Sequence, residues 1–95
     1  MPQQIRFYTI KEGELETFAH EWRRGIRPLR EALGFKIVSA WTLAAKCQFV
    51  WVLEHSAEDW TDLDARYHAS PERKALKPNP ARLIEKAEAY FLEVV

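Results

Sequence analysis

Hydrophobic and polar positions divide the chain into six segments of regular structure. Two segments repeat their apolar residues with helical spacing, and four are short runs rich in aromatic and β-branched residues, which are typical of strands. Their order, strand-helix-strand-strand-helix-strand, is the split βαβ arrangement of the ferredoxin-like fold. We therefore predict an α+β domain, βαββαβ, with a four-stranded antiparallel sheet and two helices on one face. The strands are predicted at 5–10, 35–43, 47–54 and 84–94, and the helices at 15–33 and from about 59.

The longest helical pattern contains a proline in its second half. Pro28 cannot donate a hydrogen bond to the carbonyl four residues earlier, so we expect a kink or break near Arg24. Gly34 follows the last apolar position and is suited to end the helix in the left-handed conformation. The apolar stripe of this helix consists of Leu15, Phe18, Ala19, Trp22, Ile26, Leu29 and Leu33.

Three further signals mark helix starts in the second half of the chain. Ser56 followed by Asp59 resembles a capping box and predicts the start of the second helix, whose apolar side carries Trp60, Leu63 and Tyr67. Ser70-Pro71 and Asn79-Pro80 each place a capping residue before a proline, which predicts two short helical turns.

The two central runs, 35–43 and 47–54, are apolar almost throughout, so both faces of the sheet should be covered. A second copy of the chain would cover the face without helices, and we expect a homodimer. Under strict alternation of side chains, one set suits the helix-packed core: Ile5, Phe7, Val38, Ala40, Val50, Val52, Ala87, Ala89 and Phe91. The other set mixes rings with polar groups and suits a ligand site: Arg6, Tyr8, Ser39, Trp41, Phe49, Trp51, His55, Glu88 and Tyr90.

Composition narrows the function classes. The 95 residues predict a single domain, residues 1–95, and aromatic residues make up 13% of it, a rich supply for so small a core. Lysine plus arginine equals aspartate plus glutamate at 14 each, so no long-range field favours nucleic acid or an anionic membrane. With one cysteine, Cys47, no secretory signal pattern and no apolar run long enough to span a bilayer, we expect a cytoplasmic protein.

Several segments carry a resemblance to a known family. From Gln4 to Val95 the chain resembles bacterial members of the NIPSNAP family, within the dimeric α/β-barrel superfamily. The most distinctive matches are Arg6-x-Tyr8, Gly34-Phe35 and the run from Ala69 to Lys74. The segments that carry the resemblance are IRFYTIKEGELETF, IRPLREALGFKIVSAW, FVWVLEH, YHASPERKAL and FLEVV.

The resemblance implies a homodimer in which two four-stranded sheets pack face to face as a barrel, with the helices outside. It says less about chemistry. Bacterial NIPSNAP proteins mostly lack an assigned reaction, and animal relatives are mitochondrial proteins linked to trafficking and autophagy. The superfamily also contains cofactor-independent monooxygenases, haem-degrading enzymes and lactone isomerases, and likeness of fold does not choose among these activities.

Arg6, Tyr8 and Glu88 are the candidate catalytic residues. Arg6 and Glu88 are expected on neighbouring strands, facing the same side, where they could orient a carboxylate or phenolate or act as acid and base. The structural alternative is a buried ion pair that fixes strand register, and buried ion pairs are common where charges are enclosed. Tyr8 and Tyr90 are equally open to both interpretations, since buried tyrosine hydroxyls find partners whether or not they do chemistry.

The remaining candidate ligand-binding residues are two tryptophans and two histidines. Trp41 and Trp51 could stack on a planar ligand, although rings that face a second sheet also suit a dimer core. His55 and His68 could face the cavity, but cap or rim positions are the more common use of such residues. Haem-degrading relatives use an Asn on the first strand, and this strand offers Arg6 and Tyr8 instead, which argues against haem degradation.

No cofactor or metal is predicted, because glycine-rich phosphate loops, zinc-ligand spacing and a nucleophile elbow are all missing from the sequence. Three functions stay open at this point. The first is a NIPSNAP-like protein that binds a small, partly aromatic molecule in the barrel cavity, as a binding protein or a cofactor-independent monooxygenase-like enzyme. The second is a non-catalytic structural or interaction homodimer, and the third is a haem-binding relative that uses His68 or His55.

Overall fold

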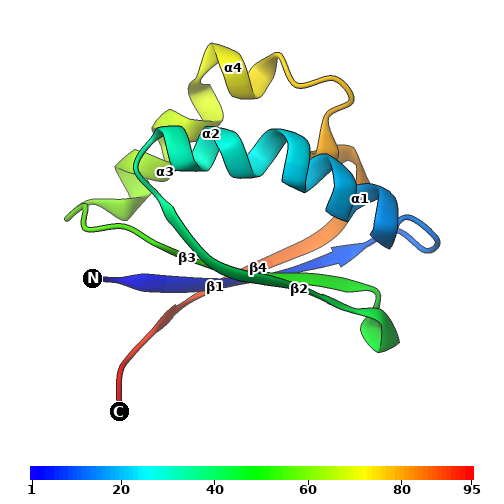
Figure 1. The fold of residues 1–95 in the computed structure, drawn as a ribbon, viewed down its shortest axis with the longest axis horizontal. Coiled ribbons are helices and arrows are strands. Elements are labelled where there is room, and N and C mark those ends of the chain that lie inside the picture. The colour runs from blue at the N-terminus through cyan, green and yellow to red at the C-terminus, as the bar shows by residue number, and fades with distance from the viewer.

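The computed structural model describes residues 1–95 and contains one four-stranded antiparallel sheet with helices on one face (Figure 1). The strand order is β2-β3-β1-β4, so each of the two βαβ units has a strand of the other unit inserted between its own two strands. This is the predicted ferredoxin-like topology. The strands are β1 (Gln3–Ile10), β2 (Lys36–Leu43), β3 (Gln48–Glu54) and β4 (Ile84–Leu92), and the helices are α1 (Leu15–Glu21), α2 (Arg27–Ala32), α3 (Trp60–Ala69) and α4 (Pro71–Lys74).

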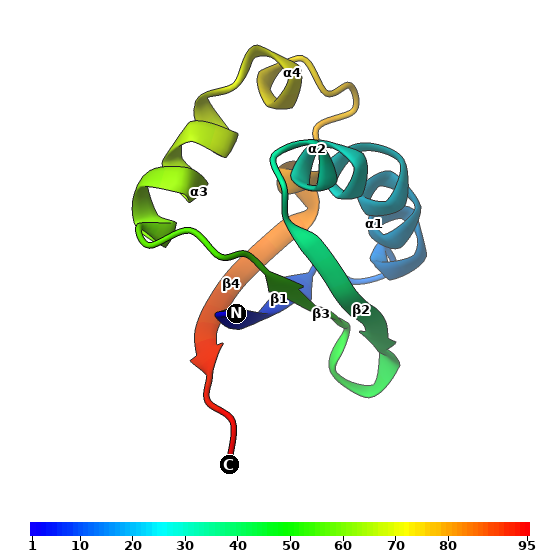
Figure 2. The ribbon, with the colours of Figure 1, turned by 60° about the vertical axis from the view of Figure 1, so that its left-hand side comes forward.

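The helices form two separate groups above the sheet. Figure 2 shows α1 and α2 together on one side and α3 with α4 on the other, with β4 crossing beneath the space between them. Ala87 and Ala89 of β4 remain exposed, although their cross-strand partners Tyr8 and Arg6 are buried. The helix-facing side of β4 is therefore only partly covered.

The first helical segment is continuous but changes its winding before the proline. A π-helical turn, Trp22–Ile26, joins α1 to α2, as expected from the missing amide hydrogen of Pro28. The extra residue in this turn rotates the following residues, so the buried positions are Phe18, Trp22, Ile26 and Arg30, four residues apart throughout. The predicted stripe was wrong at its end, because Leu33 is exposed.

Caps and turns mostly follow the predictions. Gly34 adopts a φ of +89°, as expected for a helix end. Ser70 and Asn79 cap the two predicted short turns, accepting hydrogen bonds from the amides of Arg73 (3.2 Å) and Ala81 (3.1 Å). The second helix begins differently from the prediction. Asp59, not Ser56, is its N-cap, and its side chain accepts a hydrogen bond from the Asp62 amide at 2.9 Å.

Side chains of β1 and β3 face opposite to the prediction. Arg6 and Tyr8 point toward the helices, as do their cross-strand partners Trp51 and Phe49. Ile5, Phe7, Val50 and Val52, which the sequence analysis assigned to the core, lie on the face without helices. The reason is ring size. Rings packed edge to face or tilted fill the space beneath α1 better than branched aliphatic chains could, and they belong to Tyr8, Phe18, Trp22, Phe49 and Trp51.

On the two edge strands, the facing of the side chains was predicted correctly, from Ala40 onward in β2 and from Ala87 onward in β4. A register shift in β2 between Ile37 and Ser39 leaves Val38 at the irregularity, so that Ile37 and Ala40 pack against the core while Trp41 faces away. On β4, Ala87 and Ala89 face the helices, and Glu88 and Tyr90 face away. The predicted ligand set therefore joined residues from two opposite faces of the sheet.

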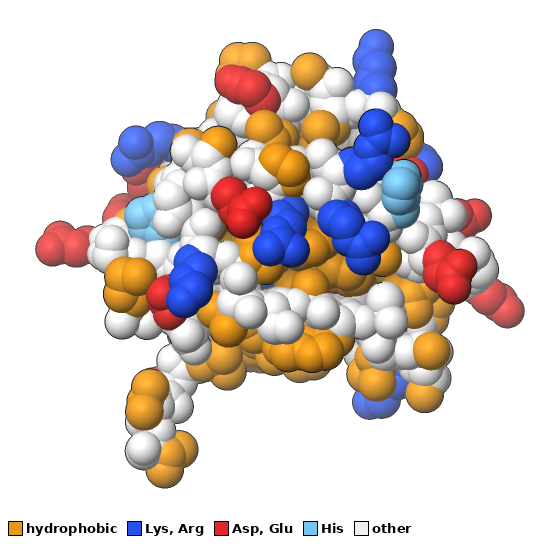
Figure 3. Space-filling model, in the orientation of Figure 1, with side chains coloured by type: hydrophobic (Ala, Val, Ile, Leu, Met, Phe, Trp, Pro, Cys, Tyr) orange, Lys and Arg blue, Asp and Glu red, His pale blue; other side chains and the backbone are white.

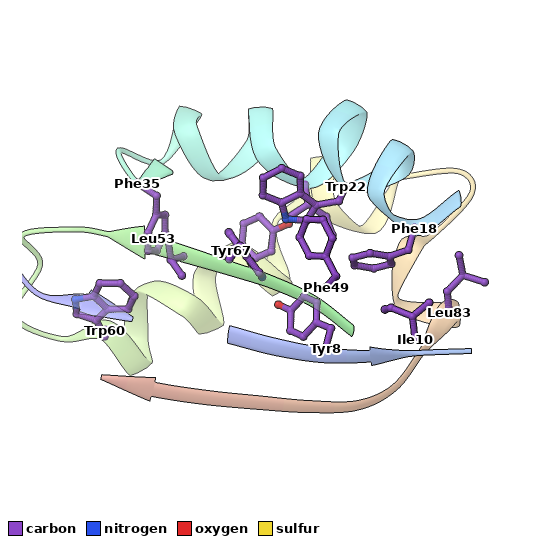
Figure 4. Packing of buried hydrophobic residues seen from close by; sticks show 12 residues of the cluster. Tyr8, Ile10, Phe18, Trp22, Phe35, Phe49, Leu53, Trp60, Tyr67 and Leu83 are labelled. Atoms are coloured by element: carbon purple, nitrogen blue, oxygen red, sulfur yellow. The ribbon is translucent and has the colours of Figure 1, made fainter. Parts of the chain in front are cut away.

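The core lies between the sheet and the helices and is dominated by rings (Figure 4). Trp22 of the π-helical turn packs on Phe49 and Trp51, with ring centres 4.9 and 5.3 Å apart. Tyr67 reaches into the same layer from α3. Further along the sheet, Trp60 at the start of α3 packs against Phe35, so both helical groups are joined to one core.

The opposite face of the sheet has no helix over it and carries large apolar side chains. Trp41, Tyr90 and Leu92 are 50%, 52% and 43% exposed. Hydrophobic side chains are visible along the underside of the molecule in Figure 3, below the sheet. We call this surface, made by Ile5, Phe7, Trp41, Val50, Val52, Tyr90 and Leu92, the open face.

Candidate functional site

A pocket of about 220 Å³ lies between the sheet and the two helical groups. It exists because β4 contributes only the methyl groups of Ala87 and Ala89 opposite the helices, where larger side chains would close the space. Its apolar lining also includes Ile26 of the π-helical turn and Ile84 at the start of β4. Its lining side chains with polar groups on the helix side are Arg6, Tyr8, Arg30, Tyr67, His68 and Arg73.

Two buried arginines at the pocket share one carboxylate oxygen. Arg6 of β1 donates from Nη2 to Asp64 Oδ1 at 3.0 Å, and Arg30 of α2 donates from Nη1 to the same atom at 2.7 Å. The Arg6 and Arg30 side chains are 9% and 1% exposed, whereas that of Asp64 is 31% exposed. Asp64 therefore ties α2 and β1 to α3 through one group at the border of the core.

The remaining groups on Arg6 are also satisfied. Its Nε donates to Gln4 Oε1 at 2.7 Å, and its Nη1 lies 3.5 Å from the Tyr8 hydroxyl. Its guanidinium carbon lies 5.6 Å from the centre of the Trp51 ring. Burial acts to lower the pKa of Arg6, but Tyr8 and Asp64 outweigh burial, and the pKa is raised. Arg6 stays charged in the folded protein.

Asp64 is held in its ionised form. Burial alone would raise the pKa of this carboxyl, but the hydrogen bond to His68 and the charges of Arg6 and Arg30 outweigh burial and place the pKa far below its ordinary value. His68 Nε2 lies 3.5 Å from Asp64 Oδ2, one helical turn along α3, and the His68 side chain is 55% exposed. His68 thus lies on the rim of the pocket, beside the Asp64 carboxylate, which already accepts hydrogen bonds from Arg6 and Arg30.

Arg30 is enclosed mainly by rings. Its guanidinium carbon lies 3.7 Å from the centre of the Tyr67 ring, 5.0 Å from that of Phe35 and 5.8 Å from that of Trp51. Its Nε has no hydrogen-bond partner and is fully buried. Burial and the neighbouring charge of Arg6 lower the pKa of Arg30, against the opposing effect of Asp64.

Tyr67 and Arg73 complete the polar lining. The Tyr67 hydroxyl is buried without a partner, and burial raises its pKa despite the nearby charges of Arg30 and Arg73. Arg73, on the short helix α4, donates from Nη1 to Asn79 Oδ1 at 3.1 Å, while its Nε is buried and unpartnered. Its guanidinium carbon lies 5.9 Å from the Tyr67 ring centre.

The structure brings three predicted site residues, Arg6, Tyr8 and His68, to the pocket. Trp51 contacts both Arg6 and Arg30, but it is completely buried and belongs to the hydrophobic core. The pocket lies on the helix side of the sheet. The interpretation that ligand residues occupy the other face was therefore wrong for Arg6 and Tyr8.

The structure does not bring the other predicted residues to the pocket's interior. Trp41 and Tyr90 lie on the open face. Glu88 borders the pocket through its place in β4, but its side chain is on the open-face side, where it accepts a hydrogen bond from the Tyr90 hydroxyl at 2.6 Å. Arg6 pairs with Ala89 across the strands, so Arg6 and Glu88 face opposite sides and form no acid-base pair.

His55 caps the end of the first helical segment. Its Nε2 donates to the Leu33 carbonyl at 3.1 Å, and its Nδ1 accepts from the Ala57 amide at 2.8 Å. Its ring packs against Phe35. Both ring nitrogens are therefore used within the chain, at a distance from the pocket's lining.

Sequence reasoning missed Arg30, Asp64 and Arg73 as site residues. Asp64 follows Trp60 by four residues and precedes Tyr67 by three, so a carboxylate stands on the apolar stripe of α3, and this was a readable signal. Arg30 is not part of the apolar stripe that the sequence predicts for the first helix. Its burial depends on the π-helical turn, which the sequence pattern indicates only as a kink.

This chain resembles known proteins in its structure. No family model matches the chain, and no curated protein matches it. Among solved structures, an uncharacterised NIPSNAP domain protein from Burkholderia xenovorans matches with a TM-score of 0.82 at 19% identity, covering 100% of this chain and 95% of that one. A NIPSNAP family protein from Agrobacterium tumefaciens matches with a TM-score of 0.86 at 14% identity, covering 99% and 92%.

The chain shares the ferredoxin-like fold of these NIPSNAP proteins. A putative antibiotic biosynthesis monooxygenase from Nitrosomonas europaea shares this architecture at a TM-score of 0.70 and 12% identity, covering 100% of this chain and 99% of that one. The NIPSNAP proteins therefore superpose more closely on this chain than this monooxygenase does. In this chain, no cluster of three or more His, Cys, Asp or Glu side chains could hold a metal ion, and none of the helices is both long and apolar enough to cross a membrane.

Proposed function

We propose that this chain is a NIPSNAP-type protein that binds a small, partly aromatic molecule in the pocket between the sheet and the helices. The observation that carries the proposal is that one pocket brings apolar side chains together with three largely buried arginines. Arg6 and Arg30 share the single carboxylate of Asp64, and Arg73 has none. A small molecule with an apolar ring and a polar group matches both parts of this lining.

The pocket's size and lining restrict the ligand. About 220 Å³ is below the roughly 300–1,000 Å³ of pockets for drug-sized molecules, so a compound with a single ring suits it best. The Tyr67 ring and the methyl groups of Ala87 and Ala89 offer apolar contacts. A ring with one or two polar substituents would satisfy both parts of the lining.

The proposal is for binding without an assigned reaction. A monooxygenase-like reaction would require a group free to accept a proton from the substrate. Asp64 is held ionised by two guanidinium groups, and Glu88 faces the other side of the sheet. Haem binding has no support either, because His68 lies against Asp64 and His55 binds the chain's own backbone.

The test is to fill the pocket. In the Ala89→Leu variant, the added side chain occupies the space opposite Arg6. A panel of neutral and charged single-ring compounds is measured against both proteins by saturation-transfer NMR. We expect members of the panel to bind the wild type, to bind the control variant Ala45→Leu in an exposed turn, and to lose their signals with Ala89→Leu. Binding that persists in the filled variant, or no binding to the wild type, contradicts the proposal.

A second proposal concerns the open face. We propose that two copies of the chain associate through it as a homodimer, because Trp41, Tyr90 and Leu92 are large apolar side chains that stay 43–52% exposed on a face that no helix covers. In this proposal the open face holds the two copies together, and the pocket on the helix side binds the ligand. The two functions use opposite faces of the sheet and do not compete.

A further inference from the structure

The pocket carries more positive charge than the protein balances. Three arginines, Arg6, Arg30 and Arg73, are buried around it at 7%, 1% and 9% exposure. Asp64 is the one carboxylate that pairs with any of them. Since a guanidinium is always charged at neutral pH, the three arginines and Asp64 together carry a net charge of about +2, and Arg73 has no carboxylate partner. A buried charge without a counter-ion is unfavourable, so this arrangement needs an explanation.

The excess is concentrated at Arg73 and Arg30. Arg73 forms no ion pair, and its one side-chain hydrogen bond is to the neutral Asn79 amide oxygen. Arg30 shares Asp64 with Arg6 and keeps its Nε without a partner. Both arginines line the pocket beside Tyr67, with their guanidinium carbons 3.7 and 5.9 Å from the centre of its ring. Arg73 is 9% exposed and Arg30 only 1%, so Arg73 is the one of the two that a ligand can contact.

We propose that the pocket binds the anion of a single-ring aromatic carboxylic acid, with the carboxylate on Arg73, where it also balances the charge of the buried Arg30, and the ring over Ala87 and Ala89. This inference rests on the proposed ligand-binding function and specifies its chemical class. A planar guanidinium fork matches a carboxylate with two parallel hydrogen bonds. The methyl groups and Ile26 and Ile84 provide the apolar contact for the ring.

Inorganic phosphate is the competing anion. It would satisfy the charge but would leave the apolar half of the pocket without contacts, whereas an aromatic acid uses both halves. A neutral amide of the same shape would use the apolar half but would leave the two guanidinium charges unbalanced. The class of ligand can therefore be identified with three simple probes.

The experiment is isothermal titration of the full chain at low ionic strength with benzoate, benzamide and inorganic phosphate. We expect benzoate to bind most tightly, and benzamide and phosphate to bind at least about tenfold more weakly, as charged hydrogen bonds contribute roughly 1.5–3 kcal/mol. In Arg73→Gln, benzoate should bind about 10- to 100-fold more weakly. Arg66→Gln, which changes an exposed arginine of α3, should bind like the wild type.

Several outcomes separate this inference from the proposed function. If benzamide or phosphate binds as tightly as benzoate, or if Arg73→Gln binds benzoate normally while Ala89→Leu does not, the pocket stands and the carboxylate class is overturned. If no probe binds the wild type, or if binding survives in Ala89→Leu, the proposed function falls as well. Arg73→Lys, which keeps the charge without the fork, should recover part of the benzoate affinity, and circular dichroism confirms that each variant is folded.

Discussion

Asp64 shows how a single residue can join three elements. Its Oδ1 accepts hydrogen bonds from Arg6 on β1 and Arg30 on α2, while the residue itself belongs to α3. Without it, two nearly buried guanidinium groups would face each other with no negative charge between them. The charge at this position therefore matters more to stability than its modest burial suggests.

We expect Asp64→Asn to lower the free energy of unfolding by about 2–3 kcal/mol at pH 7, somewhat less than the 3–5 kcal/mol of a fully buried broken pair, because the side chain is 31% exposed. Urea denaturation measures the change. The matched control is Asp62→Asn on the same helix, whose exposed pair with Arg66 should contribute about 0.5 kcal/mol or less. Equal effects of the two variants would contradict the assigned contacts.

The ionisation of Asp64 also makes the stability of the protein depend on pH. The pKa of Asp64 is lowered on folding from its ordinary 3.8, so the unfolded chain takes up the proton first as the pH falls. The stabilisation from Asp64 is complete above this value and is progressively lost below it. The stability gap between wild type and Asp64→Asn should thus be constant from pH 7 to 5 and narrow from pH 4 to 2.5. A gap that does not change with pH would rule out an ionised Asp64.

At the scale of elements, α1 and α2 show how a backbone irregularity changes which side chains are buried. Pro28 removes one helical hydrogen bond, and the π-helical turn that precedes it rotates α2 so that Arg30 faces the core. The sequence indicated where the irregularity would be. It did not indicate the direction of rotation, which depends on the rings of Tyr67 and Phe35 that receive the guanidinium group.

The start of α3 gives a test at this scale. Asp59→Ala removes the side chain that accepts a hydrogen bond from the Asp62 amide, and should destabilise the protein by about 1 kcal/mol. Thermal and urea unfolding measure this change. Ser56→Ala is the control, because Ser56 is exposed and does not cap the helix, and its stability should equal that of the wild type. A larger loss for Ser56→Ala would restore the capping box that the sequence suggested.

At the scale of the whole molecule, the sheet separates two surfaces with different chemistry. The helix side contains the charged pocket, and the open face is apolar. Strands with large residues on both faces are expected where both faces are covered, and the helices cover only one. The predicted homodimer would cover the other.

We expect the wild type to behave as a dimer in size-exclusion chromatography with light scattering at micromolar concentration. The double variant Trp41→Ser, Tyr90→Ser removes the two most exposed rings of the open face and should give a monomer. The control is Val94→Ser, at a fully exposed position near the C-terminus. A monomeric wild type, or a double variant that stays dimeric, would contradict association through this face.

The sequence by itself determined the order of elements, their approximate bounds, the turn at Pro28 and most of the caps. These features depend on local physics: the periodicity of apolar residues, the missing amide hydrogen of proline and the short side chains that bind nearby backbone amides. The ferredoxin-like topology was also predictable from the order of elements, because few arrangements bury six such segments in one domain.

Only the tertiary structure decided which face of each strand meets the helices, and therefore where the pocket lies. Alternation divides a strand into two sets but does not orient them, and the sets of β1 and β3 differ mainly in the presence of rings and a charge. Arg6 was assigned away from the helices because its set mixes large rings with polar groups, a combination that suits a ligand site. Its partner, Asp64, lies 58 residues away, and only folding brings the two together.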